Sequence, residues 1–234
     1  MAKRSKLYRA QLATYDKSVV LNVLDALKTL KAMPAVKFDQ TVELAFKLGV
    51  DPKQTDQTVR GAVPLPKGTG KKVVVTVITD DEQLKQDALA NGADFVGFDD
   101  LIEKIKGGWM DFDIAIATTE AMKEVRKIAR VLGPRGLMPN PKTGTVTDDV
   151  AAGVKAAMAG RVEYRMDRTG NVSVPAGKLS FEPKKLEENI VTIVKTIRAE
   201  RPASVKGVFI RSITISSTMG VGVPVLHQAD AAAE

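Results

Sequence analysis

Residues 71–79, "KKVVVTVIT", form an apolar, β-branched run that indicates a buried strand. A helical pattern follows at residues 81–92 and ends at an Asn-Gly pair. The alternation then continues with expected strands at 94–98 and 112–118 and expected helices at 99–108, 120–132 and 148–160. Strands without clean polar alternation, separated by helices, are typical of a parallel sheet covered on both faces. Residues 68–159 are therefore predicted to form a small Rossmann-like parallel α/β domain.

The flanks of this segment show a different pattern. Residues 16–33 have the spacing of an amphipathic helix, and "VKFDQTVELAFKL" at 36–48 alternates apolar and polar residues, with Gln40 interrupting. Period two predicts a sheet with one covered and one open face. Further on we expect a hairpin at 160–175, a helix at 183–197 and a final strand at 206–220.

Neither flank has enough strands for a stable sheet of its own. The two flanks are therefore expected to fold together, as a discontinuous two-layer α+β domain of residues 1–67 and 160–234 with residues 68–159 inserted. The chain would cross between the domains near 63–72 and at Ala159-Gly160, and a two-stranded connection of this kind favours hinge motion.

Several acids precede or begin the expected helices of the insert. Thr147 is expected to cap the helix at 148–160, and Asp100 with Glu103 matches a capping box. Capping is also the expected role, in preference to catalysis, of the remaining acids at these positions, namely Asp80, Asp81, Asp99, Asp148 and Asp149.

Composition excludes several kinds of site. The chain of 234 residues has no cysteine and one histidine, His227, in an alanine-rich tail. The absence of cysteine excludes disulfides and thiol chemistry. With a single histidine in the tail, we expect neither a metal site nor a catalytic Ser-His pair. The basic N-terminus lacks the apolar core of a signal peptide, and the apolar runs are too short to span a bilayer, so we expect a soluble cytoplasmic protein.

The net charge of +7 favours a polyanionic partner, either nucleic acid or an anionic membrane, although many soluble proteins are mildly basic. The excess is unevenly distributed. Residues 1–67 and 160–234 hold 23 Lys and Arg against 14 Asp and Glu, a net of +9, whereas residues 68–159 have a net of −2. The discontinuous domain is therefore the better candidate for binding a polyanion.

A second basic feature lies within the acidic insert. Residues 133–147 read "GPRGLMPNPKTGTVT", in which proline and glycine alternate. A loop of this length inside a compact domain is usually functional or disordered, and prolines argue against disorder. The preceding helix should carry its basic residues on one stripe, which with the loop predicts an anion-binding tip formed by Lys123, Arg126, Lys127, Arg130, Arg135 and Lys142. The alternative is a solvated helix face beside a loop without function.

Enzyme motifs are not found. The stretch "KGTGKK" at 67–72 lacks the first glycine and the Ser/Thr of a phosphate-binding loop, and it precedes a strand. The turn "DDEQ" at 80–83 would repel phosphate, and no G-x-G-x-x-G occurs at a strand-helix turn. We expect no cofactor.

Three passages resemble the ribosomal protein family named L-one: residues 133–145, 37–71 and 212–223 ("SITISSTMGVGV"). The similarity extends from about Tyr8 to Val223. It implies a non-enzymatic protein of the mobile stalk of the large ribosomal subunit, present as a monomer within the ribosome. Its discontinuous domain would hold large-subunit ribosomal RNA, and its insert would face the exit-site transfer RNA. Many bacterial members also bind their own messenger RNA and repress its translation.

The resemblance also implies site residues. The ribosomal RNA surface would comprise Lys37, Phe38, Thr41, Glu43, Asp167, Arg168, Thr169, Ser212, Thr218, Met219 and Gly220. The side facing transfer RNA would comprise Lys123, Arg126, Arg130, Arg135 and Lys142. Alternation alone would place Phe38 in the core, so its place in the list depends on the resemblance. Two alternatives stay open: a nucleotide-dependent enzyme using the inserted domain, and a basic protein that binds acidic proteins.

Overall fold

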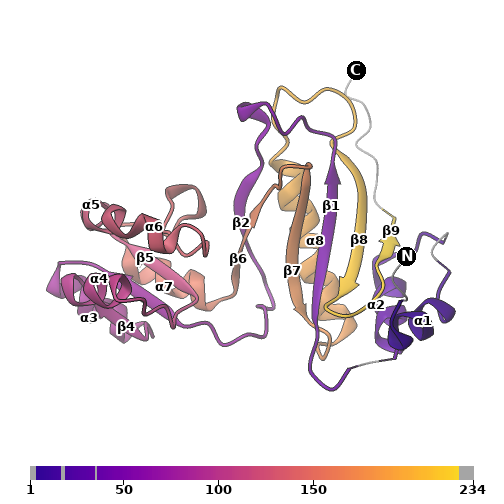
Figure 1. The fold of residues 1–234 in the computed structure, drawn as a ribbon, viewed down its shortest axis with the longest axis horizontal. Coiled ribbons are helices and arrows are strands. Elements are labelled where there is room, and N and C mark those ends of the chain that lie inside the picture. The colour runs from indigo at the N-terminus through magenta and orange to yellow at the C-terminus, as the bar shows by residue number, and fades with distance from the viewer. Residues whose placement is uncertain (1–3, 17–18, 35, 227–234) are drawn as a thin grey trace. The chain divides into compact units, whose positions relative to one another are not determined.

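The computed structural model describes residues 4–16, 19–34 and 36–226 of the chain. Contacts divide the chain into two units (Figure 1). We call Met1–Gly70 with Val162–Glu234 the antiparallel unit, and Lys71–Arg161 the parallel unit. None of the helices in the described ranges is long and apolar enough to span a membrane.

A four-stranded antiparallel sheet with strand order β7-β1-β8-β9 is the centre of the antiparallel unit. Its strands are β1 (Thr41–Leu48), β7 (Asn171–Lys178), β8 (Ile210–Ser217) and β9 (Val223–Val225). Along β1 the apolar side chains at every second position are buried, each at most 2 % exposed: Val42, Leu44, Phe46 and Leu48. The sheet with one covered face, predicted from this alternation, is confirmed.

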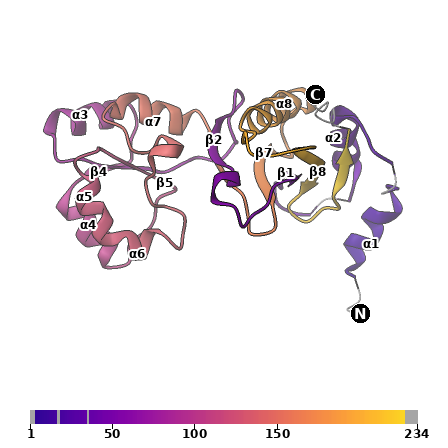
Figure 2. The same cartoon turned by 90° about the horizontal axis from the view of Figure 1, so that it is seen from above.

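Two helices cover that face: α2 (Val23–Ala32) and α8 (Pro183–Ala199). Figure 2 shows α8 lying along one side of the sheet. The buried stripe of α8 has helical spacing, with Leu186, Ile190, Ile193 and Ile197 each at most 1 % exposed. The side chains of this stripe and of β1 belong to a single apolar core.

The prediction of one helix over residues 16–33 was wrong. A separate helix, α1 (Lys6–Ala13), lies upstream, and α2 begins only at Val23. Just before α2, the backbone of Leu21 donates to the carbonyl of Pro224 and accepts from the amide of Leu226. This pairing beside β9 holds the segment extended, so a tertiary contact prevails over the helical spacing.

The hairpin expected at residues 160–175 was also wrong. The turn exists, but β6 (Arg161–Arg165) pairs with β2 (Arg60–Pro64) in a separate two-stranded sheet, while β7 joins the large sheet. A short 3-10 helix, Thr55–Gln57, precedes β2. Consecutive strands thus diverge because β6 and β7 have different partners from distant parts of the chain.

The parallel unit has the doubly covered sheet that was predicted. Its strands β3 (Val75–Ile78), β4 (Phe95–Gly97) and β5 (Ile114–Ala117) are parallel, in the order β4-β3-β5. One face packs against α3 (Glu82–Ala90) and α7 (Val150–Met158), and the other against α4 (Asp99–Lys106) and the helical segment 122–132 (Figure 2). The mixed α/β and α+β fold class is confirmed.

Helix starts in the parallel unit differ in detail from expectation. Asp81 caps α3 by accepting from the amide of Gln83 at 2.8 Å, which confirms a capping role for that acid. The cap of α7 is Asp149, not Thr147, because Thr147 accepts from the Asp149 amide in the preceding turn. Asp100 lies inside the first turn of α4, so it forms no capping box.

A buried amide ties together the part of the antiparallel unit next to its first crossing. Asn189 on α8 is fully buried; its side-chain oxygen accepts from the amide of Lys67, and its nitrogen donates to the carbonyls of Gly68 and Ala176. These three bonds join α8, β7 and the segment where the chain leaves the unit.

Replacing this amide by a side chain of similar size should therefore destabilise the antiparallel unit. Asn189→Leu leaves three backbone groups without partners, and we expect it to lower the free energy of unfolding by about 2–3 kcal/mol. Urea denaturation followed by circular dichroism measures the change. As a control, Glu188→Ala removes the neighbouring ion pair to Lys67, which is exposed, and should cost less than about 1 kcal/mol. Equal effects of the two substitutions would contradict the role given to the amide.

Candidate nucleic-acid interface

The face of the sheet opposite α2 and α8 carries mainly short or polar side chains. We call it the open sheet face, and it consists of Thr41, Glu43, Ala45, Lys47, Ser212, Thr214 and Ser216. The strand register places Glu43 opposite Ser216 and Lys47 opposite Ser212. Hydroxyl groups and small side chains on a twisted sheet allow a second backbone to approach closely.

Hydrogen bonds between Thr41 and Thr218 close one end of this face. The amide of Thr41 donates to the Thr218 hydroxyl at 3.0 Å, and the amide of Thr218 donates to the Thr41 carbonyl at 3.1 Å. The Thr218 hydroxyl also donates to the Thr41 carbonyl at 3.3 Å, and Lys178 Nζ donates to the Thr41 hydroxyl at 3.1 Å. The turn after β8 is thereby held against the start of β1.

Gln40 completes this contact from the buried side. Its side chain is 2 % exposed, and its Oε1 accepts from the amide of Met219 at 3.0 Å. Glycine at position 220 leaves room for the Ser217 side chain, because a Cβ on Gly220 would lie 2.1 Å from the Ser217 hydroxyl oxygen and would force it to move. Sequence analysis missed Gln40 as a site residue, although a polar residue that interrupts an apolar series was the available signal.

Two large apolar side chains stand out from this end of the face. Phe38 and Met219 are each 54 % exposed, beside the hydrogen-bonded pair of threonines. The placement of Phe38 in the core, which alternation alone would give, was wrong because β1 begins only at Thr41. Exposed apolar groups beside fixed polar groups are typical of a binding surface.

The turn Asp167–Gly170 lies at the other end of β1. The Asp167 carboxylate accepts from the amides of Asn171 and Thr169, both at 2.8 Å, and from both of their side chains. The bond from the Asn171 amide is the largest of the effects that hold the pKa of Asp167 well below its ordinary value. Lys47 Nζ donates to the Thr169 carbonyl at 2.7 Å, so the turn is attached to the open sheet face with Arg168 exposed at its tip.

The residues predicted for ribosomal RNA thus form two groups at the two ends of β1. The group at the start of β1 comprises Lys37, Phe38, Thr41, Glu43, Thr218, Met219 and Gly220. The group at its end comprises Asp167, Arg168, Thr169 and Ser212, joined through Lys47. At about 3.3 Å per residue, β1 itself is about 25 Å long. The structure therefore places all eleven around one sheet face, and their contact with RNA stays a prediction.

A basic surface lies on the parallel unit. The expected helix at 120–132 is broken into α5 (Met122–Val125), a 3-10 turn (Arg126–Ile128) and α6 (Ala129–Leu132). Its basic residues are nevertheless all exposed, opposite the buried Val125, Ile128 and Leu132, and they are Lys123, Arg126, Lys127 and Arg130. Lys127 forms an ion pair with Glu124 at 2.6 Å.

The loop at 133–147 that follows is ordered by its own hydrogen bonds. The carbonyl of Asn140 accepts from the hydroxyls of Thr143 and Thr145 at 3.1 and 3.3 Å, and these two threonines are 0 % and 9 % exposed. Val146 then forms a parallel bridge with Ala117 of β5. Arg135 is exposed on this loop, and Lys142 lies in the 3-10 helix Pro141–Thr143, with its side chain outside what the structure describes.

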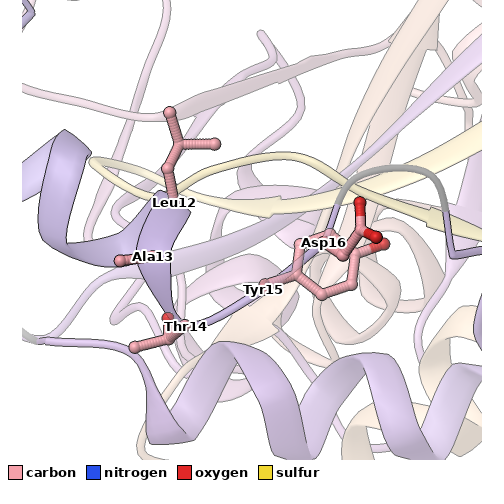
Figure 3. Close-up of a pocket in the computed structure, with 5 residues that line it drawn as sticks. All are labelled: Leu12, Ala13, Thr14, Tyr15 and Asp16. Carbon is pink, nitrogen blue, oxygen red and sulfur yellow. The ribbon is translucent and has the colours of Figure 1, made fainter.

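A hollow of about 530 Å³ lies at the end of α1, and it is not a candidate site. Figure 3 shows the five side chains that line it, which belong to the consecutive residues Leu12–Asp16. The Tyr15 hydroxyl donates to the carbonyl of Val19, and burial, with a smaller effect of Asp16, raises the pKa of Tyr15. No two elements bring chemical groups together at this hollow. Among the described residues no cluster of His, Asp or Glu is suited to a metal ion either.

The Asp167 turn gives a test that needs no ligand. Asp167→Ala removes the acceptor of four hydrogen bonds, so the amides of Thr169 and Asn171 should lose their protection from hydrogen exchange, measured by NMR. In the unchanged protein the lowered pKa of Asp167 means that its carboxylate stabilises the turn fully above about pH 5. Part of this stabilisation should remain below the ordinary aspartate pKa of about 3.9. Asp51→Ala, in another exposed turn, is the matched control and should leave both amides protected. Protection that disappears in the unchanged protein near pH 4 would contradict the assigned hydrogen bonds.

Comparison with known proteins tests whether the chain belongs to the family that its sequence motifs resemble. The sequence model of the Ribosomal protein L1p/L10e family matches residues 27–221. A relative from Kosmotoga olearia, named Large ribosomal subunit protein uL1, is 49% identical over 228 residues, which cover 97% of this chain and 98% of the relative. The resemblance seen in the sequence motifs is confirmed, and the chain belongs to the Ribosomal protein L1p/L10e family.

Proposed function

We propose that the protein is a constituent of the large ribosomal subunit, on the ribosome in the cytoplasm, and that its antiparallel unit binds a structured element of large-subunit ribosomal RNA. The observation that carries this proposal is the open sheet face with the fixed Thr41–Thr218 pair at its edge. Membership of a ribosomal protein family supports it. So does the basic excess of residues 1–67 and 160–234, a net of +9.

The chemistry of the open sheet face suits RNA shape better than bare charge. Thr41, Glu43 and Ser212 offer hydroxyl and carboxylate groups that can exchange hydrogen bonds with ribose 2′-hydroxyls. Phe38 and Met219 can cover the apolar face of a ribose or a base. The surrounding basic residues supply phosphate attraction that carries no sequence information. Affinity and specificity would therefore come from different side chains.

The parallel unit would contact the exit-site transfer RNA and assist its release. Arg126, Arg130 and Arg135 are exposed on the basic surface, and the hydrogen-bonded loop keeps its backbone in one arrangement. Electrostatic contact with phosphates is non-specific, which suits a partner whose sequence changes with each round of translation.

A messenger RNA that carries a similar structured element would fit the same sheet face. We therefore include repression of the protein's own message in the proposal. The family is one of structural ribosomal proteins, so the chain is not an enzyme. The turn after β3 agrees with this, since Asp81 caps α3 where a nucleotide phosphate would have to lie.

Specific RNA recognition can be separated from charge attraction by a salt series. Thr218→Ala with Met219→Ala should weaken binding to a ribosomal RNA stalk fragment by on the order of tenfold at every salt concentration, because only uncharged contacts are lost. The slope of affinity against salt should stay unchanged. Filter binding or fluorescence anisotropy measures both quantities.

The matched control is Thr192→Ala with Val191→Ala, on the helix that covers the opposite face of the sheet. It removes the same kinds of side chain and should leave RNA binding unchanged. Equal binding by both double variants and the unchanged protein, with a steep salt slope, would mean that basic charge alone binds the RNA.

The role of the basic surface can be tested on reconstituted ribosomes. Arg126→Ala, Arg130→Ala and Arg135→Ala together should slow the release of transfer RNA from the exit site, while binding to the stalk fragment stays unchanged. The control replaces three exposed lysines that lie outside the basic surface but in the same unit by alanine, namely Lys104, Lys106 and Lys155. Loss of ribosomal RNA binding in the arginine variant, or equal slowing in the control, would contradict the division of roles.

A further inference from the structure

A hollow of about 330 Å³ lies beside the segment that leads into β1. It is lined by Lys31, Phe38, Asp39, Gln40, Leu179 and Ser180. Gln40 links it to the proposed RNA surface, because its side chain also accepts from the amide of Met219. Pockets for small molecules usually have about 300–1,000 Å³, so the hollow is large enough for one flat heterocycle.

The polar group that this hollow presents is a carboxylate held in place. Asp39 Oδ2 accepts from the Ser180 hydroxyl at 2.8 Å, and Oδ1 accepts from the Ser180 amide at 3.2 Å. Each carboxylate oxygen can accept more than one hydrogen bond, so both keep acceptor capacity. No ion pair within the described ranges includes Asp39, and the amine of Lys31 donates to the carbonyl of Phe181.

These groups favour a base over a phosphate. A carboxylate repels phosphate, whereas the exposed ring of Phe38 and the side chain of Leu179 suit the flat face of an unstacked base. Guanine carries two adjacent donors, N1–H and the 2-amino group, that can meet the two oxygens of one carboxylate. The other three bases lack this pair of donors on one edge.

We propose that the hollow beside Phe38 receives one unstacked guanine of the bound RNA, covered by Phe38 and hydrogen-bonded to Asp39. The inference rests on the proposed binding of ribosomal RNA by the antiparallel unit. It adds base-specific recognition at the edge of a surface whose other contacts read backbone shape. Ser180 acts as the positioning residue, since it fixes the carboxylate through both its amide and its hydroxyl.

The test uses the whole protein, a ribosomal RNA stalk fragment and kethoxal, which modifies N1 and N2 of unpaired guanines. At saturating protein, one guanine should be protected in the complex with the unchanged protein and should become reactive with Asp39→Asn. Replacing that guanosine by inosine removes the 2-amino group and should weaken binding of the unchanged protein roughly tenfold, but binding of Asp39→Asn much less. Asp25→Asn, an exposed aspartate on α2, is the matched control and should preserve the protection.

The outcomes separate this inference from the function on which it rests. If the fragment binds but Asp39→Asn leaves the reactivity of every guanine unchanged, the guanine site is wrong and ribosomal RNA binding stands. If the inosine substitution weakens both proteins equally, the base is recognised elsewhere and the site is again wrong. If the unchanged protein does not bind the fragment, the proposed function fails and the guanine site fails with it.

Discussion

The antiparallel unit depends on the pairing of β1 with two strands from the far end of the chain. β1 lies between β7 and β8, so residues 41–48 hydrogen-bond with residues near 171–178 and 210–217. The first and last parts of the chain must therefore fold together, and the stretch between them must leave the unit and return. The stretch that leaves and returns includes the parallel unit, Lys71–Arg161. The fully buried Asn189 ties the point of departure to the core.

One-sided burial of the same sheet produces the candidate interface. Because α2 and α8 cover only one face, every second residue of β1 is available on the other. Those positions carry Thr41, Glu43 and Lys47, while Ser212 and Ser216 lie opposite on β8. Successive residues of β1 thus point alternately into the core and onto the candidate interface. A shift of the strand register by one residue would exchange the buried and the outward-facing side chains.

Sequence patterns predicted correctly those helices and strands that pack against neighbours close in the sequence, or that have a regular alternation of buried and exposed residues. The parallel unit is such a case, because strand-helix repeats specify both the order of elements and the burial of both faces. The helix expected at 16–33 and the hairpin at 160–175 failed where distant strands decide the outcome: Leu21 bonds beside β9, and β6 pairs with β2. The candidate site came mainly from the family resemblance. Composition could locate a basic domain, but it could not show that Gln40, buried in the core series, reaches the amide of Met219.

Acidic groups on the proposed RNA surface need a physical reason, and the reason for Asp167 differs from that for Glu43 and Asp39. The Asp167 carboxylate accepts hydrogen bonds from four donors within its own turn, and these bonds fix the turn that carries Arg168 at its tip. Glu43 and Asp39 keep acceptor capacity outward, where in the proposed complex they would repel phosphate and accept from hydroxyl or amino groups. A basic surface alone attracts any stretch of backbone in many registers. Carboxylates at fixed places would exclude the registers that put phosphate on them. In the proposed complex, repulsion at these positions would therefore contribute to specificity, while the lysines and arginines around them would supply attraction.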